Sequence, residues 1–145
     1  MRIVVKKATE KNLESIWTLD CMVLGNSSRK DFLTNAVRAD QCWIAQIGGT
    51  VAGFGVFEQS FYGHGFISLL IVHPNHRRRS VATALIRHIE SICPTEKLFT
   101  STNESNLTAQ RVFEALGFVR SGCIENLDEG DPEIIYFKHL GDNSA

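Results

Sequence analysis

The stretch that decides the fold reads Leu69-Leu70-Ile71-Val72-His73-Pro74-Asn75-His76-Arg77-Arg78-Arg79-Ser80-Val81-Ala82-Thr83-Ala84-Leu85. It begins inside a nearly continuous apolar run, Phe66–Val72, which is typical of a strand buried on both faces. Pro74 ends this strand, and apolar residues then recur at helical spacing from Val81 to Ile92, just before Pro94. The stretch therefore predicts a buried strand, a short basic loop and an amphipathic helix.

The start of this helix has the features of an anion-binding site. The first N–H groups of a helix have no intrahelical partners, and the helix dipole places partial positive charge there. Three arginines, Arg77–Arg79, precede the helix, although cations are disfavoured at that position. A bound anion would resolve the conflict, and the small residues Ser80 and Ala82 would let it approach the backbone. The stretch predicts a pyrophosphate-binding loop, but it has neither the Walker pattern nor the dinucleotide glycine pattern.

The rest of the chain predicts one mixed α/β (α+β) domain around a single sheet. Strands are expected at residues 3–8, 42–47, 51–57, 97–101, 118–124 and 134–140, and helices at residues 9–24, around 32–37 and at 107–116. Two of these strands flank Gly48-Gly49, which indicates a β-hairpin. Thr9 is expected to cap the first helix, and Gly117 is expected to end the last one in a left-handed conformation.

Composition narrows the class of protein. The chain has 145 residues, of which 43% are hydrophobic and 21% charged, as in an ordinary globular domain. No apolar run is long enough to span a membrane, and the first residues do not resemble a secretion signal. The net charge of -1 argues against a dedicated nucleic-acid binder. The four cysteines have no metal-ligand spacing, so we expect no metal site and reduced, mostly buried thiols in a cytoplasmic protein.

Two motifs resemble those of the GNAT superfamily, the acetyl-CoA-dependent N-acetyltransferases. Val72-x-Pro74 followed by Arg77-x-x-Ser80-x-Ala82 is similar to the family's Q/R-x-x-G-x-G/A loop. Asn106 to Phe118 resembles its N-x-x-A-x-x-x-Y-x-x-x-G-F helix and strand. The resemblance implies a mostly antiparallel sheet of about six to seven strands flanked by about four helices, in a single domain over residues 1–141 with a short tail, 142–145.

The same resemblance implies a set of acetyl-CoA contacts. The strand would pair its backbone with the pantetheine arm, the loop and helix start would hold the pyrophosphate, and the second motif would contact the coenzyme. The residues implied are Leu70, Ile71, Val72, Arg77, Arg78, Arg79, Ser80, Val81, Ala82, Thr83, Asn106 and Phe113.

Three positions depart from the family pattern. Ser80 replaces the usual first glycine, which is tolerable if its backbone is right-handed, because the N–H group does the binding. Phe113 replaces the tyrosine that many members use to protonate the departing thiolate, so it is expected to pack against the coenzyme or the core. Ser101 stands where several relatives place a catalytic glutamate, and a serine is not a competent base unaided.

The general base and acid are therefore not identified by a motif. An amine acceptor must lose a proton before it attacks the thioester, and a backbone N–H near Ile71–Val72 is expected to stabilise the oxyanion. We predict Glu58 as the base and Tyr136 as the acid. The alternative bases are His64, Glu104 and His73, and the alternative acid is Tyr62. The plainer interpretation of His73 and His76 is that they flank the phosphate loop.

An acidic run near the C-terminus suggests the acceptor. Glu125 to Glu133 contains five carboxylates and no Lys or Arg. Asp128, Glu129 and Asp131 are therefore predicted to attract a cationic amine, with a solvated hairpin loop as the plainer interpretation.

The sequence thus predicts an N-acetyltransferase that moves acetyl directly from acetyl-CoA to a primary amine of a small molecule or protein, in a ternary complex. The alternatives are a non-catalytic acyl-CoA-binding or sensor domain and, more weakly, a partner-binding module that uses Arg77–Arg79. We expect no nucleic-acid or membrane partner, and a homodimer stays open.

Overall fold

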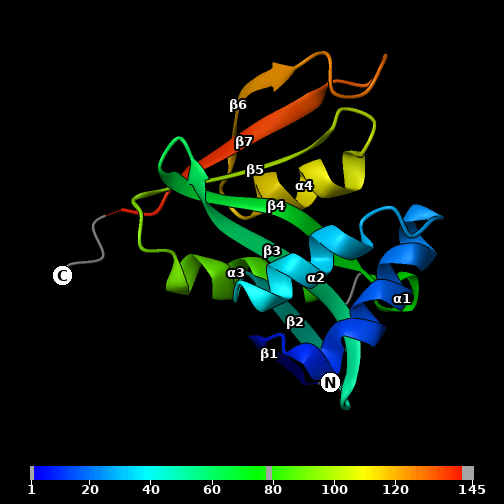
Figure 1. The fold of residues 1–145 in the computed structure, drawn as a ribbon. Helices are drawn as coiled ribbons and strands as arrows, with labels where there is room; N and C mark the ends of the chain where they lie inside the picture. The colour runs from blue at the N-terminus through cyan, green and yellow to red at the C-terminus, as the bar shows by residue number, and fades with distance from the viewer. Residues whose placement is uncertain (1, 78–79, 142–145) are drawn as a thin grey trace. The chain divides into compact units, whose positions relative to one another are not determined.

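The structure is a computed structural model that describes residues 2–77 and 80–141 (Figure 1). Its strands are β1 (Ile3–Lys7), β2 (Cys42–Ile47), β3 (Thr50–Phe61), β4 (His64–Val72), β5 (Lys97–Asn103), β6 (Val119–Ile124) and β7 (Glu133–His139). Its helices are α1 (Leu13–Leu24), α2 (Lys30–Arg38), α3 (Val81–Ile92) and α4 (Leu107–Ala115), with short 3-10 turns η1 (Glu10–Asn12) and η2 (Pro74–His76). The predicted order of strands and helices is confirmed.

The strands are hydrogen-bonded in the order β1-β2-β3-β4-β5-β7-β6. β4 and β5 run parallel, while β1–β2, β2–β3, β5–β7 and β6–β7 are antiparallel, so the expected mostly antiparallel sheet is confirmed. The chain forms two compact units: the first comprises residues 1–57 and 69–89, and the second residues 58–68 and 90–145. None of the described helices is long and apolar enough to cross a membrane.

The first unit buries side chains on both faces of its strands. On one face, α1 and α2 pack against β2, β3 and β4, and this cluster includes Ile16, Leu33, Ile44, Phe54 and Ile71. On the other face, Val81 and Leu85 of α3 pack against Ala45, Ala52, Leu70 and Val72. Alternation along β4 thus sends Ile71 to the α1 side and its neighbours to the α3 side, as expected for a strand packed on both faces.

A glycine lets α3 lie close to the strands. A Cβ atom added to Gly53 of β3 would lie 2.8 Å from the Ile71 carbonyl oxygen and 2.9 Å from Cγ1 of Val81. Real Cβ atoms essentially never come so near to other heavy atoms, so any side chain here would push β4 or α3 away. Gly53 therefore sets the spacing between β3, the end of β4 and the start of α3.

The second unit has one face covered by α4. Phe113 of α4 packs against Tyr136 of β7 and against Phe118, at ring-centroid distances of 5.4 and 6.0 Å. Strand alternation turns Phe99 and Phe137, which contact each other at 5.4 Å, to the opposite face. Phe61 stacks on Phe66 at 4.6 Å and contacts Phe99 on that same opposite face. The α4 face of this unit is core, and the opposite face carries half-buried aromatic rings.

The prediction that Thr9 caps the first helix is confirmed at the turn η1, with which this helix begins: Thr9 and Asn12 form a capping box, in which Oδ1 of Asn12 accepts a hydrogen bond from the Thr9 N–H at 2.8 Å. Two other local predictions need correction. Phe32, the first apolar residue of the second predicted helix, is 43% exposed, while Leu33, Ala36 and Val37 form the buried face of α2. Of the four cysteines, all free thiols, only Cys42 and Cys93 are buried, whereas Cys21 and Cys123 are exposed.

Candidate functional site

The loop after β4 is held by its first residue. The His73 N–H donates to the Ala52 carbonyl of β3 at 2.8 Å, and His73 Nδ1 accepts from the Asn75 N–H at 3.0 Å. The second bond caps the turn η2, in which Pro74 supplies a fixed backbone angle. The rings of His73 and His76 meet edge to face at 5.4 Å. Both histidines thus shape the loop that leads to α3.

Ser80, the residue just before α3, has a left-handed backbone with φ +63°. The condition under which serine is expected to be tolerable here, a right-handed backbone, is therefore not met. A non-glycine residue at positive φ costs about 1 kcal/mol or more, and such strain concentrates at functional sites. The left-handed residue turns the chain so that α3 starts at once: the Ala84 N–H bonds back to the Ser80 carbonyl at 2.9 Å.

The start of α3 offers a row of backbone donors. The N–H groups of Val81, Ala82 and Thr83 precede the first intrahelical hydrogen bond, so they belong to the set that a helix leaves for other partners. Val81 is buried, whereas Ala82 and Thr83 are half-buried. Arg77, three positions before Ser80 in the chain, is exposed, and Arg78 and Arg79, predicted to bind the pyrophosphate, lie outside the described residues. A left-handed residue followed by the first N–H groups of a helix is an arrangement that binds anions.

The end of β4, from residue 69 onward, belongs to the first unit and is the last strand segment of that unit along the chain. Backbone groups alternate between the two edges of a strand, and the His73 N–H points to β3. The backbone of Ile71 therefore also points to β3, as the approach of its carbonyl to Gly53 shows. The N–H and C=O groups of Leu70 and Val72 point to the other edge, which no described strand of the first unit covers. These two residues can pair with an extended ligand through their backbone.

Asn106 and Phe113, both predicted to contact the coenzyme, have structural partners in the second unit. Asn106 is exposed and caps α4, because its Oδ1 accepts from the Ala109 N–H at 3.1 Å. Phe113 is 3% exposed and packs among the rings described above. Of the two roles expected for Phe113, its packing favours the core. The coenzyme contact of Asn106 stays a prediction.

The two predicted catalytic residues lie in the second unit. The Tyr136 ring is fully buried on the α4 face, and its hydroxyl donates to Oε2 of Glu114 at 2.9 Å. Burial, together with the Glu114 carboxylate, raises the pKa of Tyr136, which makes its phenol a weaker acid. Glu58 is half-buried near the end of β3. Its role as a base stays a prediction.

The alternative acids and bases are placed as follows. His64 is the first residue of β4 rather than part of an exposed loop, and its half-buried ring lies 5.9 Å from Phe99. Tyr62 is 88% exposed in the turn before it, at φ +53°. Glu104 is exposed, and its N–H donates to the Pro132 carbonyl at 2.8 Å.

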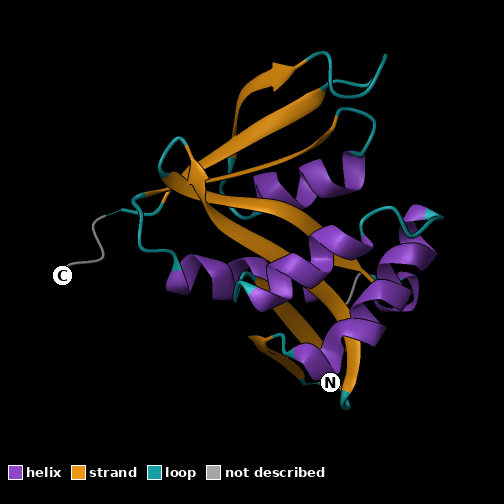
Figure 2. Cartoon of the chain, viewed as in Figure 1, coloured by secondary structure: helices purple, strands orange, loops and turns teal. Residues whose placement is uncertain are grey.

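Two carboxylates of the acidic run tie its loop to the last residue of β5 and to the loop that follows it. Figure 2 shows both loops in teal at the right-hand ends of their strands. Asp128 Oδ2 accepts from Asn103 Nδ2 at 2.8 Å. Asp131 accepts from the N–H and the hydroxyl of Ser105 at 3.0 and 2.6 Å. Glu129 is exposed. The run is thus a structured acidic surface, and its role in acceptor binding stays a prediction.

A carboxylate that the sequence analysis did not single out lies against Ser101. The Ser101 hydroxyl donates to Oε2 of Glu133 at 2.7 Å, and both side chains are half-buried. The two residues are separated by 32 positions, and they meet because β5 pairs with β7 in a register that sets Ser101 opposite Ile135. No spacing rule connects them in the sequence. Only the register of β5 and β7 could have found this pair.

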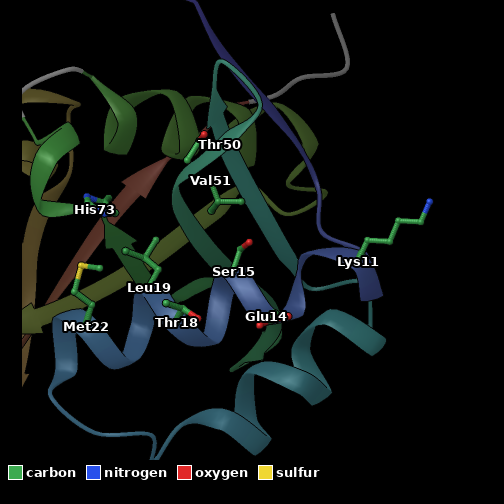
Figure 3. Close-up of a pocket in the computed structure, with 9 residues that line it drawn as sticks. All are labelled: Lys11, Glu14, Ser15, Thr18, Leu19, Met22, Thr50, Val51 and His73. Atoms are coloured by element: carbon green, nitrogen blue, oxygen red, sulfur yellow. The ribbon is translucent and has the colours of Figure 1, made fainter.

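The first unit also contains an open pocket of about 430 Å³ (Figure 3). It lies between α1, the start of β3 and His73, and it is lined by Lys11, Glu14, Ser15, Thr18, Leu19, Met22, Thr50, Val51 and His73. In Figure 3 the Lys11 side chain points away from the other lining residues. None of the described residues predicted to bind acetyl-CoA lines this pocket.

Comparison with known proteins identifies the family. The model of the acetyltransferase (GNAT) family matches residues 11–118. The chain belongs to the GNAT acetyltransferase family. As a GNAT protein it is an acyltransferase. No functionally curated protein matches the sequence.

Solved GNAT structures resemble the chain over nearly its whole length. A GNAT-family acetyltransferase from Bacillus cereus has 42% sequence identity and a TM-score of 0.92, over 96% of this chain and 98% of that one. The ribosomal-protein-S18-alanine N-acetyltransferase of Escherichia coli shares the fold at 18% identity, with a TM-score of 0.81 and 99% of both chains covered. The yncA protein of Salmonella typhimurium, solved with its cofactor acetyl-CoA, has 14% identity and a TM-score of 0.80, over 99% of this chain and 96% of that one.

Proposed function

We propose that the protein is an N-acetyltransferase that transfers acetyl from acetyl-CoA directly to a primary amine in a ternary complex. The observation that carries this proposal is the start of α3, where the left-handed Ser80 precedes the backbone donors of Val81, Ala82 and Thr83. A diphosphate suits this row because it is doubly charged and accepts several hydrogen bonds at once. Arg77, three positions before Ser80 in the chain, is exposed and positively charged.

The edge of β4 supports binding of the rest of the coenzyme. Pantetheine contains two amide groups, and an extended amide chain can pair with an open strand edge. Leu70 and Val72 present their backbone groups there, while their side chains are engaged with α3. We infer that these two residues, rather than Ile71, hold the pantetheine arm. One of their N–H groups is then the donor for the thioester oxygen as negative charge develops on it.

The departing group requires little help from an acid. An ordinary thiol has a pKa of about 8.5, so a thiolate leaves more readily than an alkoxide near neutral pH. Tyr136 is a weak candidate, because its hydroxyl is committed to Glu114 on the core face and its pKa is raised. We therefore assign no protein acid to this step.

The acceptor is proposed to be a cationic primary amine. Asp128, Glu129 and Asp131 lie on the acidic loop between β6 and β7, and no Lys or Arg lies between Glu125 and Glu133. A surface that carries several negative charges raises the local concentration of a positively charged substrate. The loop is held in place by Asn103 and Ser105, so its charges are presented on a fixed surface.

The test is release of free CoA from acetyl-CoA in the presence of a panel of amines. The panel contains a polyamine, a lysine derivative, peptides with free N-termini and an aminoglycoside. In each reaction a thiol reagent detects the released CoA, and mass spectrometry measures the mass of the product. We expect acetyl-dependent CoA release with at least one cationic amine and a product heavier by one acetyl group. Binding of acetyl-CoA without release with any amine would contradict the proposal.

A further inference from the structure

Ser101 and Glu133 are joined by a short hydrogen bond across β5 and β7. The Ser101 hydroxyl donates to Oε2 of Glu133 at 2.7 Å, a distance typical of hydrogen bonds between two oxygen atoms. When the hydroxyl hydrogen points to Glu133, the lone pairs of Ser101 Oγ point elsewhere and can accept a hydrogen bond. The pair can therefore take a proton from a donor that contacts Ser101.

The pair lies on the face of the second unit that α4 leaves uncovered. Thr100 is opposite Tyr136 in the β5–β7 register, and Tyr136 faces α4, so the adjacent Ser101 faces the other way. The aromatic rings of Phe99 and Phe137 lie on the same face as Ser101. Aromatic faces attract ammonium groups, so this surface suits a protonated amine as well as its neutral form.

A second observation on this face points to an absent partner. Ser68 of β4 follows Phe66 by two positions, so its side chain lies on the face of the aromatic rings. Its Oγ is buried and has no hydrogen-bond partner among the described residues. Buried polar atoms are nearly always hydrogen-bonded in native proteins, so Ser68 Oγ is available to a polar ligand or a water on this face.

We propose that Ser101 and Glu133 together accept the proton of the acceptor amine, which rests on the proposed function above. A primary amine with a pKa of about 10.4 is almost entirely protonated at pH 7, and its ammonium form cannot attack a thioester. The ammonium donates a hydrogen bond to Ser101 Oγ. Ser101 receives that proton and passes its own hydroxyl proton to Glu133, so that the amine becomes neutral and Glu133 becomes a carboxylic acid.

The remaining steps balance without another reagent. The amine lone pair forms the C–N bond to the acetyl carbon, and the C–S bond then breaks to give the amide and the CoA thiolate. The amide nitrogen loses its second proton to solvent, Glu133 also releases its proton to solvent, and the thiolate takes up one proton from solvent. The net reaction converts ammonium and acetyl-CoA into amide, CoA thiol and one released proton, and Glu133 returns to its charged form.

The other carboxylates of the acidic run are less suited to this role. Asp131 is engaged by two hydrogen bonds from Ser105, and Asp128 by one from Asn103. Glu129 is exposed. Among the described residues, the groups that face Glu133 across the strands are Ser101 and Asn103 from β5 and Ile124 from β6, and Asp128 is the nearest loop charge through Asn103. Asp131 is also half-buried and bonded to a hydroxyl, but its partner Ser105 is exposed, whereas the hydroxyl bonded to Glu133 belongs to the half-buried Ser101.

The test compares Glu133→Gln, Ser101→Ala and Ser101→Thr in the full chain, with Glu96→Gln as the matched surface control. The acceptor is the amine that gives the highest rate with the wild type. Because a general base contributes about 10²- to 10⁴-fold, we expect Glu133→Gln to lower kcat about 100-fold or more. Ser101→Ala should lower it less, since a water can replace the hydroxyl, and Ser101→Thr should restore most of it. The acetyl-CoA dissociation constant should stay within about twofold in all four variants.

The pH profile separates proton transfer from a structural role. In Glu133→Gln only the neutral amine reacts, so kcat should rise about tenfold per pH unit between pH 7 and 9, towards the pKa of the amine. The wild type should be nearly level over that range. Equal slopes, or a Glu133→Gln variant that keeps more than half of the wild-type kcat, would overturn the proposal.

Failures of different claims have different signatures. If Glu133→Gln does not fold, as judged by thermal unfolding, the Ser101→Ala and Ser101→Thr pair decides: equal rates in that pair overturn the role of the hydroxyl. A wild type that releases no CoA with any amine overturns the proposed function and this inference together. A wild type that turns over while its variants are unaffected overturns this inference alone.

Discussion

The β4–α3 region of the first unit and the β5–β7 face of the second unit represent two ways of building function. At the start of α3 the relevant groups are backbone N–H groups, oriented by one left-handed residue and by the spacing that Gly53 allows. On the β5–β7 face they are side chains from strands far apart in the sequence, brought together by register. The first arrangement tolerates substitution of side chains, and the second does not.

The comparison is tested most strongly by adding one charge to the backbone site. Ala82→Asp should weaken acetyl-CoA binding about 100-fold, because a carboxylate beside the donor row repels the diphosphate. It should leave thermal stability nearly unchanged, since an acidic residue is favourable in the first turn of a helix. Calorimetric titration with acetyl-CoA measures the first effect, and thermal unfolding measures the second.

Ala82→Asn is the matched control, because it has nearly the same size without the charge. It keeps the backbone N–H and should bind acetyl-CoA within a few-fold of the wild type. If Asn weakens binding as much as Asp, the site depends on the small side chain rather than on the backbone and its charge.

The spacing that Gly53 sets should be costly to change. Gly53→Ala forces a methyl group against the Ile71 carbonyl and Val81, so we expect a loss of about 2 kcal/mol in the free energy of unfolding. Gly55→Ala is the control: its Cβ would meet Leu70 and Ile89 side chains at 3.4 and 3.5 Å, which is near ordinary contact. Denaturant unfolding of both variants checks this, and equal stabilities would show that β3 and α3 adjust without strain.

The acidic loop should affect the acceptor and not the coenzyme. Asp131→Asn removes one charge and weakens the hydrogen bonds from Ser105, so we expect the apparent KM for a cationic amine to rise about fivefold. The KM for acetyl-CoA should not change. Steady-state kinetics at low and moderate salt measure both values, and the effect should shrink as salt screens the charge. An acetyl-CoA KM that rises in parallel would contradict the separation of the two regions.

The smallest expected effect concerns Tyr136, on the face of β7 that packs against α4. Tyr136→Phe removes the hydrogen bond to Glu114, which should cost about 1 kcal/mol of stability at pH 7. The raised pKa of Tyr136 means that the folded chain favours the neutral phenol. The stability that Tyr136 contributes through its raised pKa is therefore fully present below about pH 10, the pKa of tyrosine in the unfolded chain. It is lost as the pH rises through the pKa of Tyr136 in the folded chain. Denaturant unfolding at pH 7 and pH 10.5 should show the difference from the wild type narrowing at the higher pH.

Local pattern was enough to predict most of the fold. The apolar run before Pro74, the Gly48-Gly49 hairpin and the helical spacing after Val81 each depend on neighbours in the sequence, and each element formed. The misplaced features depend on geometry that a pattern does not carry. Ser80 adopts a conformation more typical of glycine, and His64 enters a strand because β3 continues to Phe61 and turns at Tyr62–Gly63.

The site divides in the same way. The row of donors at the start of α3 could be predicted, because a helix N-terminus leaves its N–H groups unpaired whatever its side chains are. The assignment of Leu70 and Val72 to the open edge needed the hydrogen bond between His73 and Ala52. The Ser101–Glu133 pair needed the β5–β7 register, and a search for a single base at one motif position overlooked it.

The most direct measurement is a calorimetric titration of the wild type with acetyl-CoA and, in parallel, with S-acetylpantetheine, which lacks the diphosphate and the nucleotide. If the backbone donors of α3 hold the diphosphate, acetyl-CoA should bind in the micromolar range and acetylpantetheine at least about 100-fold more weakly. Equal affinities for the two ligands, or no binding of acetyl-CoA, would contradict the account.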